Sequence, residues 1–339
     1  MTYAPSPARP AALLAMSRDL PAQLMTPAQH ARLEELVELL RPDAVADLAD
    51  VPPAELARVE ILVTGWGAPR VDAAALARMP RLRAVVHTAG STQHVLGPEA
   101  WEREGFVATT AAQANAVPVA EYSLAQILLA GKHRLARAAE HRRSRGTTAA
   151  WRTDTGGGNY GATVGLIGAS RIGRLVAELL RPFALQVLIA DPYVSADDAA
   201  ALGAEHVTLP ELFSRSDVVS LHAPDVPSTR GMVSRELLAR MPDGATFINT
   251  ARPALVDEDA LREELVSGRI SAVLDVHDAL GPEDPLWDVP TVEITPHIAG
   301  SLGNELHRMA QMALEDLARI VDGRPPQHPV DPGLRAITA

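Results

Sequence analysis

GATVGLIGASRIGRLVAELLRPFALQVLIAD, residues 161–191, holds in order a short apolar run, a turn bounded by glycines, an amphipathic segment and a second apolar run that ends in an acidic residue. The runs at 164–167 and 187–190 predict buried parallel strands, and the apolar spacing of residues 171–180 predicts a helix between them. The N-terminus of this helix then points at the turn, where unpaired N–H groups and the helix dipole favour an anion. This order is typical of a dinucleotide-binding βαβ unit.

The turn approximates the pattern G-x-G-x-x-G, with Ser170 in the place of the second glycine. Glycine at both ends allows a tight turn and close packing of strand on helix, and the Ser170 hydroxyl could itself donate to a phosphate. We therefore expect the pyrophosphate of a dinucleotide at Gly168, Ser170, Arg171, Ile172 and Gly173. A purely structural glycine turn in an α/β domain is the alternative.

Asp191 ends the second strand at the distance from the turn at which an acidic side chain binds a ribose diol. Pro192 and Tyr193 follow it, and no arginine is present there to receive the 2′-phosphate of NADP. The sequence therefore favours NAD over NADP as the cofactor.

The composition is that of an acidic globular protein of 339 residues, 47% of them hydrophobic, with a formal net charge of -11. This length and apolar content suffice for two domains with separate cores. The negative charge disfavours nucleic acid and anionic membranes as partners. The chain has no cysteine, which excludes disulfides and Cys-ligated zinc and is compatible with a reducing cytoplasm. The apolar run at 11–16 is too short for a secretion signal, and no segment approaches a membrane span.

Alternating strand and helix signals predict a first, small, doubly wound lobe. We expect a loose arm over the first fifteen or so residues, which are rich in Pro and Ala, and an amphipathic helix at 31–40. Strands are predicted at 60–64, 82–87 and 106–109, and helices at 71–77 and 98–104. A long helix at 118–137 begins with a proline and leaves this lobe, and residues 153–161 are predicted to be a loop.

The second lobe continues from the βαβ unit. Further strands are predicted at 218–222, 245–250, 271–276 and 292–295, and helices around 209–215, 234–241 and 257–267. A last helix at 304–322 is expected to return to the first lobe. The predicted fold class is α/β with two doubly wound parallel-sheet lobes. A Rossmann NAD-binding domain at 117–299 would be inserted in a flavodoxin-like substrate domain formed by 1–116 and 300–339.

Three polar residues stand at or just past the carboxyl ends of second-lobe strands, where open α/β sheets bind ligands. They are Arg252 in INTARPALVDEDAL, Asp275 in SAVLDVHD and His297 in ITPHIAG. Together with the glycine turn, VVSLHAPDVPSTRGMV around His222 and AVPVAEYSLAQILLA around Glu121, they make the chain similar to the D-isomer-specific 2-hydroxyacid dehydrogenases, of phosphoglycerate dehydrogenase type, over most of its length. The resemblance implies hydride transfer between the nicotinamide of NAD and a small 2-oxo or 2-hydroxy acid.

Such a reaction needs a proton donor for the carbonyl oxygen and a cation for the charges of the acid. The resemblance assigns the proton to His297, because an imidazole can donate and accept a proton near neutral pH. It assigns the cation to Arg252, whose planar fork can bind the carboxylate and polarise the carbonyl together. A satisfied loop histidine and a capping or surface arginine are the alternative interpretations.

Asp275, by resemblance, would hydrogen-bond the nicotinamide carboxamide; the alternative is a strand-end aspartate that caps a turn. The loop at Ala89, Gly90 and Ser91 would bind the substrate carboxylate through backbone N–H groups, or else be a plain turn. His222 is expected beside the cofactor rather than in proton transfer. The other cofactor contacts that the resemblance implies are Pro192, Ala223, Pro224, Thr229, Thr250, Ala251, Arg252, His297 and Gly300.

The chain departs from the family pattern five positions beyond Asp275, where the family usually has a glutamate that orients the histidine and favours its charged form. Leu280 occupies that position, and the loop around it is shorter than usual. Asp278 or Glu283 would have to take over the role. Pro253, in the place of a glycine after Arg252, is a second departure and is expected to stiffen that turn.

Two hypotheses of different class follow. The first is an NAD-dependent dehydrogenase or reductase of a 2-oxo or 2-hydroxy acid, with no metal, because the 11 histidines show no metal-ligand spacing. The second is a non-catalytic NAD-binding sensor or interaction module of the same fold. A homodimer is expected through the helix at 118–137. The substrate stays open: Arg70 is the one first-lobe cation that suggests a phosphate, and Trp66 and Trp287 would suit a larger side chain.

Overall fold

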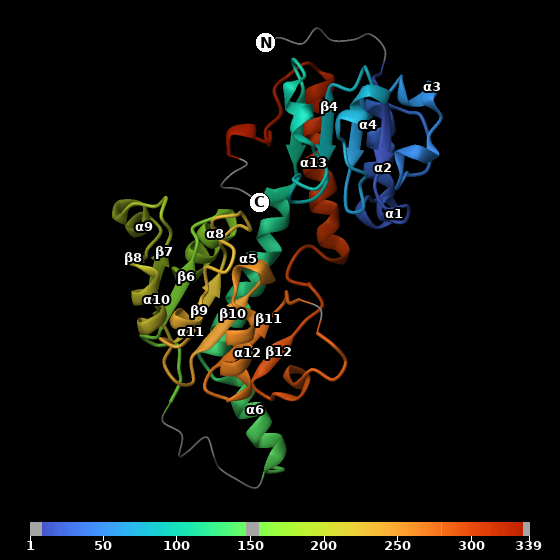
Figure 1. Cartoon of the computed structure of the whole chain (residues 1–339). Coiled ribbons are helices and arrows are strands. Elements are labelled where there is room, and N and C mark those ends of the chain that lie inside the picture. The colour runs from blue at the N-terminus through green and yellow to red at the C-terminus, as the bar shows by residue number, and fades with distance from the viewer. Residues whose placement is uncertain (1–8, 147–155, 279, 335–339) are drawn as a thin grey trace. The chain divides into compact units, whose positions relative to one another are not determined.

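The computed structural model describes residues 9–146, 156–278 and 280–334, which divide into two compact units (Figure 1). Unit 1 comprises the chain up to Asn115 together with the segment that starts at Ser301, and unit 2 comprises Ala116–Gly300. Unit 2 is therefore inserted in the sequence of unit 1. Each unit is built on a parallel sheet of its own.

The sheet of unit 1 has five parallel strands in the order β2-β1-β3-β4-β5. The strands are β1 (Ala11–Ala15), β2 (Glu38–Leu39), β3 (Ile61–Thr64), β4 (Ala84–His87) and β5 (Val107–Thr110). The helices are α1 (Leu20–Leu24), α2 (Pro27–Leu36), α3 (Pro53–Leu56), α4 (Ala73–Arg78) and α13 (Leu306–Val321), with short 3-10 turns between them. Leu14 of β1 belongs to a core that includes α2 and α13, whereas its neighbour Leu13 belongs to a core that includes α4. Both faces of the sheet are covered, which is why its strands read as continuous apolar runs.

The sheet of unit 2 has seven parallel strands in the order β12-β11-β10-β9-β6-β7-β8. The strands are β6 (Thr163–Ile167), β7 (Gln186–Ala190), β8 (Glu205–His206), β9 (Val218–Leu221), β10 (Thr246–Asn249), β11 (Ser271–Leu274) and β12 (Val292–Ile294). The helices are α5 (Ala112–Ala130), which starts in unit 1, α6 (Arg134–Arg143), α8 (Arg171–Leu180), α9 (Ala196–Ala201), α10 (Leu209–Arg215), α11 (Arg235–Leu238) and α12 (Glu258–Val266). The chain runs from β6 outward on one side and then from β9 outward on the other. Ligands of such sheets bind at the carboxyl ends beside this switch point.

The predicted fold class, two α/β lobes with parallel sheets, is confirmed. The prediction of a loose arm over the first fifteen residues is wrong for its described part. Residues 11–15 form β1, which pairs with both β2 and β3 and is buried throughout. The run AALLA is short and follows a proline, so its length and flanks resemble a linker, yet it supplies an interior strand of the sheet.

The helix expected at 31–40 lies earlier in the chain. α2 begins after Thr26, whose hydroxyl accepts a hydrogen bond from the Gln29 N–H while the Gln29 side chain accepts one from the Thr26 N–H. This capping box sets the start of the helix. Residues 38–39 are β2, and the helix expected at 98–104 is a 3-10 turn at Pro98–Glu102.

The helix predicted at 118–137 is also wrong, because Pro118 lies inside α5 instead of starting it. α5 ends at Ala130, and α6 follows after His133, which has the positive φ of 49°. Asn159 donates its amide to the carbonyl of Leu128, and the Gly158 N–H donates to the carbonyl of Gly131, so unpaired helix-end carbonyls gain partners there. Of the loop predicted at 153–161, residues 153–155 lie outside the described residues.

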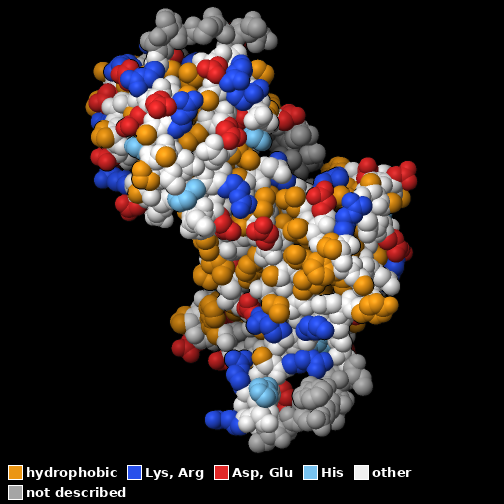
Figure 2. Space-filling model, turned by 180° about the vertical axis from the view of Figure 1, so that it is seen from behind, with side chains coloured by type: hydrophobic (Ala, Val, Ile, Leu, Met, Phe, Trp, Pro, Cys, Tyr) orange, Lys and Arg blue, Asp and Glu red, His pale blue; other side chains and the backbone are white. Residues whose placement is uncertain are grey.

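α6 reads RLARAAEHRR and is the basic helix of an acidic chain. Figure 2 shows Lys and Arg side chains gathered at the end of unit 2 that carries this helix. Within the described ranges, no helix is long and apolar enough to cross a membrane.

Candidate functional site

The glycine turn joins the carboxyl end of β6 to α8, and its geometry requires both glycines. Gly168 has a φ of 90°, and a Cβ built on it would lie 2.8 Å from the backbone N of Ala223. A Cβ on Gly173 would meet the carbonyl oxygen of Gly168. Strand, turn and helix therefore pack more closely than side chains would allow, as the binding of a dinucleotide at this turn requires.

Ser170 is the N-cap of α8, and its hydroxyl is already used. The Oγ donates to the carbonyl oxygen of His222 at 2.7 Å and accepts from the Gly173 N–H at 3.4 Å. A hydroxyl has one proton, so donation from this side chain to a phosphate would require the Oγ to release the His222 carbonyl. The backbone N–H groups of Ser170, Arg171 and Ile172 have no acceptor within the helix, and they remain the anion donors of the turn.

Asp191 follows β7 directly and lies beside the turn. Its Oδ2 accepts from the Ala169 N–H at 2.7 Å, and its Oδ1 accepts from the Tyr193 N–H at 2.8 Å. A carboxylate has about four acceptor positions, so each oxygen can take one more donor, such as a ribose hydroxyl. Pro192 and Tyr193 lie next to it, and the Tyr193 side chain is largely exposed. The turn therefore fits the pyrophosphate of NAD, and Asp191 fits its ribose.

His222 is buried at the carboxyl end of β9, and burial lowers the pKa of its imidazole to about 4. Its Nε2 forms a 2.9 Å hydrogen bond with the Ser220 hydroxyl. Ala223 and Pro224 continue from it, and the Thr229 hydroxyl closes this loop by donating to the Pro224 carbonyl at 2.6 Å. A buried neutral imidazole is suited to shaping the loop and not to exchanging protons with a substrate.

Arg252 stands just beyond β10 with an exposed side chain. Its Nη1 donates to the carbonyl of the preceding Ala251 at 2.6 Å, and among the described residues no carboxylate forms an ion pair with it. Asn249 holds the turn: its side chain accepts from the Ala251 N–H at 3.0 Å and donates to the Arg252 carbonyl at 3.2 Å. The Thr250 hydroxyl contacts that of Ser123 in α5 at 3.2 Å. The sequence does not single out Asn249, because this residue acts only through hydrogen bonds to the backbone of the adjoining turn.

His297 follows β12 in a left-handed conformation with a φ of 56°, and its side chain is exposed. Its N–H donates to the carbonyl oxygen of Asp275 at 3.0 Å. The Asp275 carboxylate accepts from the N–H groups of Ile298 and Ala299, and Gly300 follows. Asp275 is therefore the hydrogen-bonded centre of the turn that carries His297. Asp275 thus caps this turn, and its Oδ2, which accepts only from Ala299, keeps a position open for the carboxamide of a cofactor.

Leu280 is partly buried and packs against the apolar core of unit 2, near Val256, Leu261 and Leu286. Asp278 and Glu283 are both exposed. Within the described part of the chain, no carboxylate lies within ion-pair distance of the His297 imidazole. The position at which the sequence pattern lacks a glutamate is used for packing instead.

In unit 1, the loop after β4 is fastened by its neighbours on two sides. The Thr88 hydroxyl donates to the Thr64 carbonyl at 2.8 Å, and the Thr110 hydroxyl donates to the Ala89 carbonyl at 2.9 Å and also contacts the Gly90 carbonyl. Among the described residues, no acceptor is found for the N–H groups of Gly90 and Ser91.

Asn115 adds a second polar group near this loop that the sequence reasoning missed. Its Nδ2 lies 3.8 Å from where a Cβ on Gly90 would be, and its Oδ1 accepts from the Ser301 N–H at 3.0 Å. The loop thus presents free backbone donors and an amide, which suits a carboxylate.

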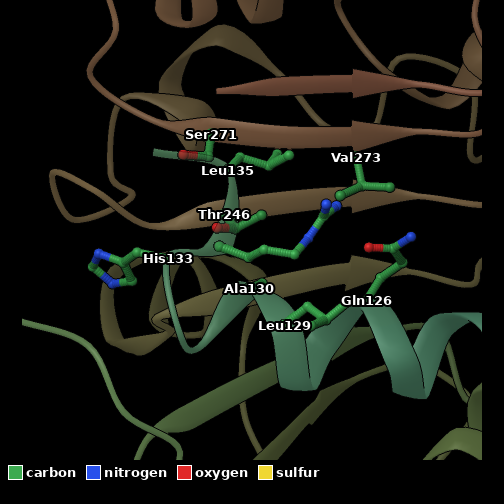
Figure 3. Close-up of a pocket in the computed structure, with 9 residues that line it drawn as sticks. Gln126, Leu129, Ala130, His133, Leu135, Thr246, Ser271 and Val273 are labelled. Atoms are coloured by element: carbon green, nitrogen blue, oxygen red, sulfur yellow. The ribbon is translucent and has the colours of Figure 1, made fainter. Parts of the chain in front are cut away.

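Figure 3 shows a pocket of unit 2 between α5 and the sheet. Its lining residues Thr246 and Ser271 are the first residues of β10 and β11, so the pocket lies at the amino edge of the sheet. Arg252 and His297 stand at the opposite, carboxyl edge. The void accommodates about one water molecule, which is too little for a substrate. The carboxyl edge is therefore the candidate site.

Comparisons with known proteins point to one family. The family model described as "D-isomer specific 2-hydroxyacid dehydrogenase, NAD binding domain" matches residues 126–299. The D-3-phosphoglycerate dehydrogenase of Mycobacterium tuberculosis is 33% identical over 310 residues, covering 89% of this chain and 56% of that relative. The glyoxylate reductase of Korarchaeum cryptofilum is 33% identical over 266 residues, covering 77% of this chain and 80% of that relative.

A solved structure shares the whole fold. The crystal structure of a Thermus thermophilus protein superposes with a TM-score of 0.72 at 31% identity, covering 95% of this chain and 100% of the other. The chain spans little more than half the length of the Mycobacterium tuberculosis D-3-phosphoglycerate dehydrogenase, of which the match covers 56%.

Proposed function

The chain belongs to the D-isomer specific 2-hydroxyacid dehydrogenase family, and on this premise we propose that it is an NAD-dependent oxidoreductase that transfers hydride between the nicotinamide and a small 2-oxo or 2-hydroxy acid. The observation that carries the proposal is the pair Arg252 and His297. Both side chains are exposed at the carboxyl edge of the sheet, and neither has a charged partner among the described residues. Groups of this kind are available to a substrate.

The cofactor would be held at the carboxyl ends of β6 and β7. The N–H groups of Ser170, Arg171 and Ile172 would bind the pyrophosphate, and Asp191 would bind the ribose and repel a 2′-phosphate. When bound, the nicotinamide would supply the hydride for reduction or accept it in oxidation. The remaining proposed contacts are Gly168, Gly173, Pro192, His222, Ala223, Pro224, Thr229, Thr250, Ala251, Asp275 and Gly300.

In the reducing direction, His297 would donate a proton to the carbonyl oxygen of the substrate as the hydride reaches C2, so that a neutral hydroxyl forms. In the oxidising direction, the same nitrogen would take the hydroxyl proton. Arg252 would bind the carboxylate and polarise the carbonyl, since its planar fork presents several N–H groups in fixed directions. The backbone N–H groups of Ala89, Gly90 and Ser91 would donate hydrogen bonds to the substrate carboxylate.

The second candidate function is a non-catalytic NAD-binding module of the same fold. One observation favours it: Leu280 packs against the core, and no described carboxylate forms an ion pair with His297. Without that partner the imidazolium form loses a stabilising charge. The two candidates differ in whether the protein turns over an acid at all: the enzyme does so and needs His297, whereas the binding module binds NAD without turnover.

We further propose that the protein acts as a homodimer in the cytoplasm. Support for the dimer comes from the apolar α5, on which Leu129 is 40% exposed. Support for the location comes from the absence of cysteine. Sedimentation of the purified chain would test the dimer directly.

The test is NADH consumption with glyoxylate, pyruvate, hydroxypyruvate, phenylpyruvate and phosphonopyruvate over a range of pH. We expect turnover with at least one of them. His297→Ala should lower kcat by about 10²-fold or more, as loss of a general acid does, and should leave NADH binding largely intact. His141→Ala, the same change at an exposed histidine of α6, is the matched control and should behave as wild type. NADH binding without turnover of any acid would favour the binding module.

A further inference from the structure

We propose that Trp66 is a specificity-determining residue in unit 1, and that the substrate is a 2-oxo or 2-hydroxy acid that carries a bulky apolar, preferably aromatic, group on C3. The inference rests on the proposed function, in which the loop at Ala89, Gly90 and Ser91 binds the carboxylate of the acid. It names the class of acid that the site would take.

Trp66 stands beside this carboxylate-binding loop. The neighbouring parallel strands β3 and β4 end at the paired residues Thr64 and His87, and Trp66 comes two residues after the first of them, as the loop does after the second. The two segments stay together beyond the strands. The Thr88 N–H donates to the Thr64 carbonyl at 2.8 Å, and a Cβ built on Gly65 would lie 2.9 Å from the Thr88 hydroxyl. Trp66 therefore lies next to the N–H groups that would bind the carboxylate.

The backbone on both sides of Trp66 is fixed by glycines. A Cβ on Gly65 would also lie 2.8 Å from the side chain of Leu20, so this residue has no room for a larger one. Gly67 has a φ of 73°, and its Cβ would overlap the Ser17 hydroxyl. The Ser17 N–H donates to the Trp66 carbonyl at 2.9 Å. The loops after β1 and β4 thus hold this segment in place, and a fixed backbone can present the indole to every substrate in the same way.

The Trp66 side chain is 45% exposed, and among the described residues its ring has neither a hydrogen-bond acceptor nor an aromatic partner. Trp287, the other candidate for an apolar wall, is 49% exposed but differs in its contacts. Its indole N–H donates to the Gly281 carbonyl at 2.9 Å, and its ring packs edge-on against His277. Trp66 is therefore the tryptophan whose ring is available, and contact with an aromatic group would remove its apolar surface from water.

A phosphate group on the substrate fits this place less well. Arg70 is exposed, and no ion pair of it is found in the part of the chain that the structure describes. The residue after it is held elsewhere, because the Val71 N–H donates to the Val95 carbonyl at 2.7 Å and its carbonyl accepts from the Gly97 N–H at 3.0 Å. Arg70 therefore stands at the far end of the Trp66 loop. A phosphate carries almost two charges and is best bound by several charged donors, yet burial lowers the pKa of His87 to about 4 and keeps it neutral.

The experiment compares kcat/KM for phenylpyruvate with kcat/KM for pyruvate, which differ only in the phenyl group on C3. Wild type should prefer phenylpyruvate at least tenfold. Trp66→Ala should reduce this ratio about tenfold and leave kcat/KM for pyruvate within about twofold, because contact between two aromatic groups has an effect of about this size. Trp66→Phe keeps a ring and should retain most of the preference. Trp287→Ala, the same change at the other exposed tryptophan, is the matched control and should leave the ratio unchanged.

The proposal is overturned if wild type does not prefer phenylpyruvate, or if Trp66→Ala leaves the ratio at its wild-type value. It is also overturned if phosphonopyruvate is preferred to both acids and Arg70→Ala removes that preference, because the substrate would then carry a phosphate-like group.

Failure of the proposed function looks different, since no acid would then be turned over. Binding still tests the inference in that case. Calorimetric titration in the presence of NADH would use 3-phenylpropanoate and propanoate, two carboxylates that cannot react. Wild type should bind the first at least tenfold more tightly than the second, and Trp66→Ala should lose most of this difference. The same difference in both proteins would contradict a contact with Trp66.

Discussion

At the scale of single residues, two histidines are buried at the ends of parallel strands and both are neutral. Burial lowers the pKa of His87 and of His222 to about 4 each. His87 bonds the Thr64 hydroxyl at 2.9 Å, and His222 bonds the Ser220 hydroxyl at 2.9 Å. They differ from the exposed His297, which is available to a substrate. Burial therefore separates structural histidines from the one to which we assign proton transfer.

These two histidines should make the protein less stable as the pH falls from about 7 to about 4. The pKa of each is lower in the folded chain than the ordinary 6.5, so the unfolded chain binds more protons in this range. The free energy of unfolding then rises with pH and falls with acid, by about 3 kcal/mol for each histidine at most. Urea denaturation of wild type and His222→Gln between pH 7.5 and 4.5 measures this. The free energy of unfolding of wild type minus that of His222→Gln should become smaller towards acid pH, because the titration of carboxylates affects both proteins alike. A difference that does not change with pH would contradict the lowered pKa of His222.

At the scale of elements, α13 holds the C-terminal segment of unit 1 against β5. Asp316 of α13 is buried and accepts from the N–H of Gln327 at 2.6 Å and from the imidazole of His328 at 3.1 Å. The Thr110 N–H donates to the His328 carbonyl, and the Val330 N–H donates to the Ala108 carbonyl. The segment therefore extends the edge of the sheet, and one carboxylate sets its path.

Asp316→Ala should lower the free energy of unfolding by about 2 kcal/mol, because it leaves buried donors without an acceptor. Hydrogen exchange at residues 327–330 should speed up more than exchange elsewhere in unit 1. Asp322→Ala at the end of the same helix is the control: Asp322 pairs with Arg324 at the surface, and such pairs contribute less than about 1 kcal/mol. Equal losses in the two variants would mean that Asp316 does not anchor the segment.

Most strands of unit 2 could be predicted within a few residues, because buried parallel strands are apolar runs with polar ends. Arg252, Asp275 and His297 were placed at strand ends for the same reason. β1 was missed because a five-residue run after proline looks like a linker, and tertiary pairing made it a strand. The start of α5 was missed because Pro118 was assigned to the first helical position, where proline is usual, although it lies inside the helix.

The parts of the site that sequence reasoning missed act through hydrogen bonds to the backbone. Asn249, Asn115 and Thr295 hold turns, and nothing in residue type or spacing distinguishes them from ordinary loop residues. Asp275 could be placed at its strand end from the sequence, but its hydrogen bonds to the N–H groups of Ile298 and Ala299 could not, because they depend on the path of the turn. Leu280 did carry a signal, since an apolar residue in a polar loop commonly packs inward.

At the scale of the whole molecule, the two units have separate cores, so a ligand that binds one unit should stabilise that unit more than the other. A ligand that binds only the folded form stabilises it by RT ln(1 + [L]/Kd), which is about 2.7 kcal/mol at a hundredfold excess over Kd. The proposed NAD site lies entirely on β6, β7, β9 and the following strands of unit 2. NADH should therefore slow hydrogen exchange throughout the core of unit 2 and leave the core strands β1 and β3 of unit 1 at their original rates.

Gly168→Ala should abolish this protection. An alanine there has an unfavourable φ of 90°, and its Cβ would lie 2.8 Å from the backbone of Ala223, so the turn must open and its N–H groups lose their common direction. Gly268→Ala is the matched control, because Gly268 also has a positive φ, of 74°, but no atom lies within 4 Å of the added Cβ. The control shares the backbone strain and should keep the response to NADH.

NADPH should protect wild type less than NADH, since its 2′-phosphate would meet the Asp191 carboxylate. Equal protection by the two cofactors, or protection retained in Gly168→Ala, would place the dinucleotide elsewhere on the sheet.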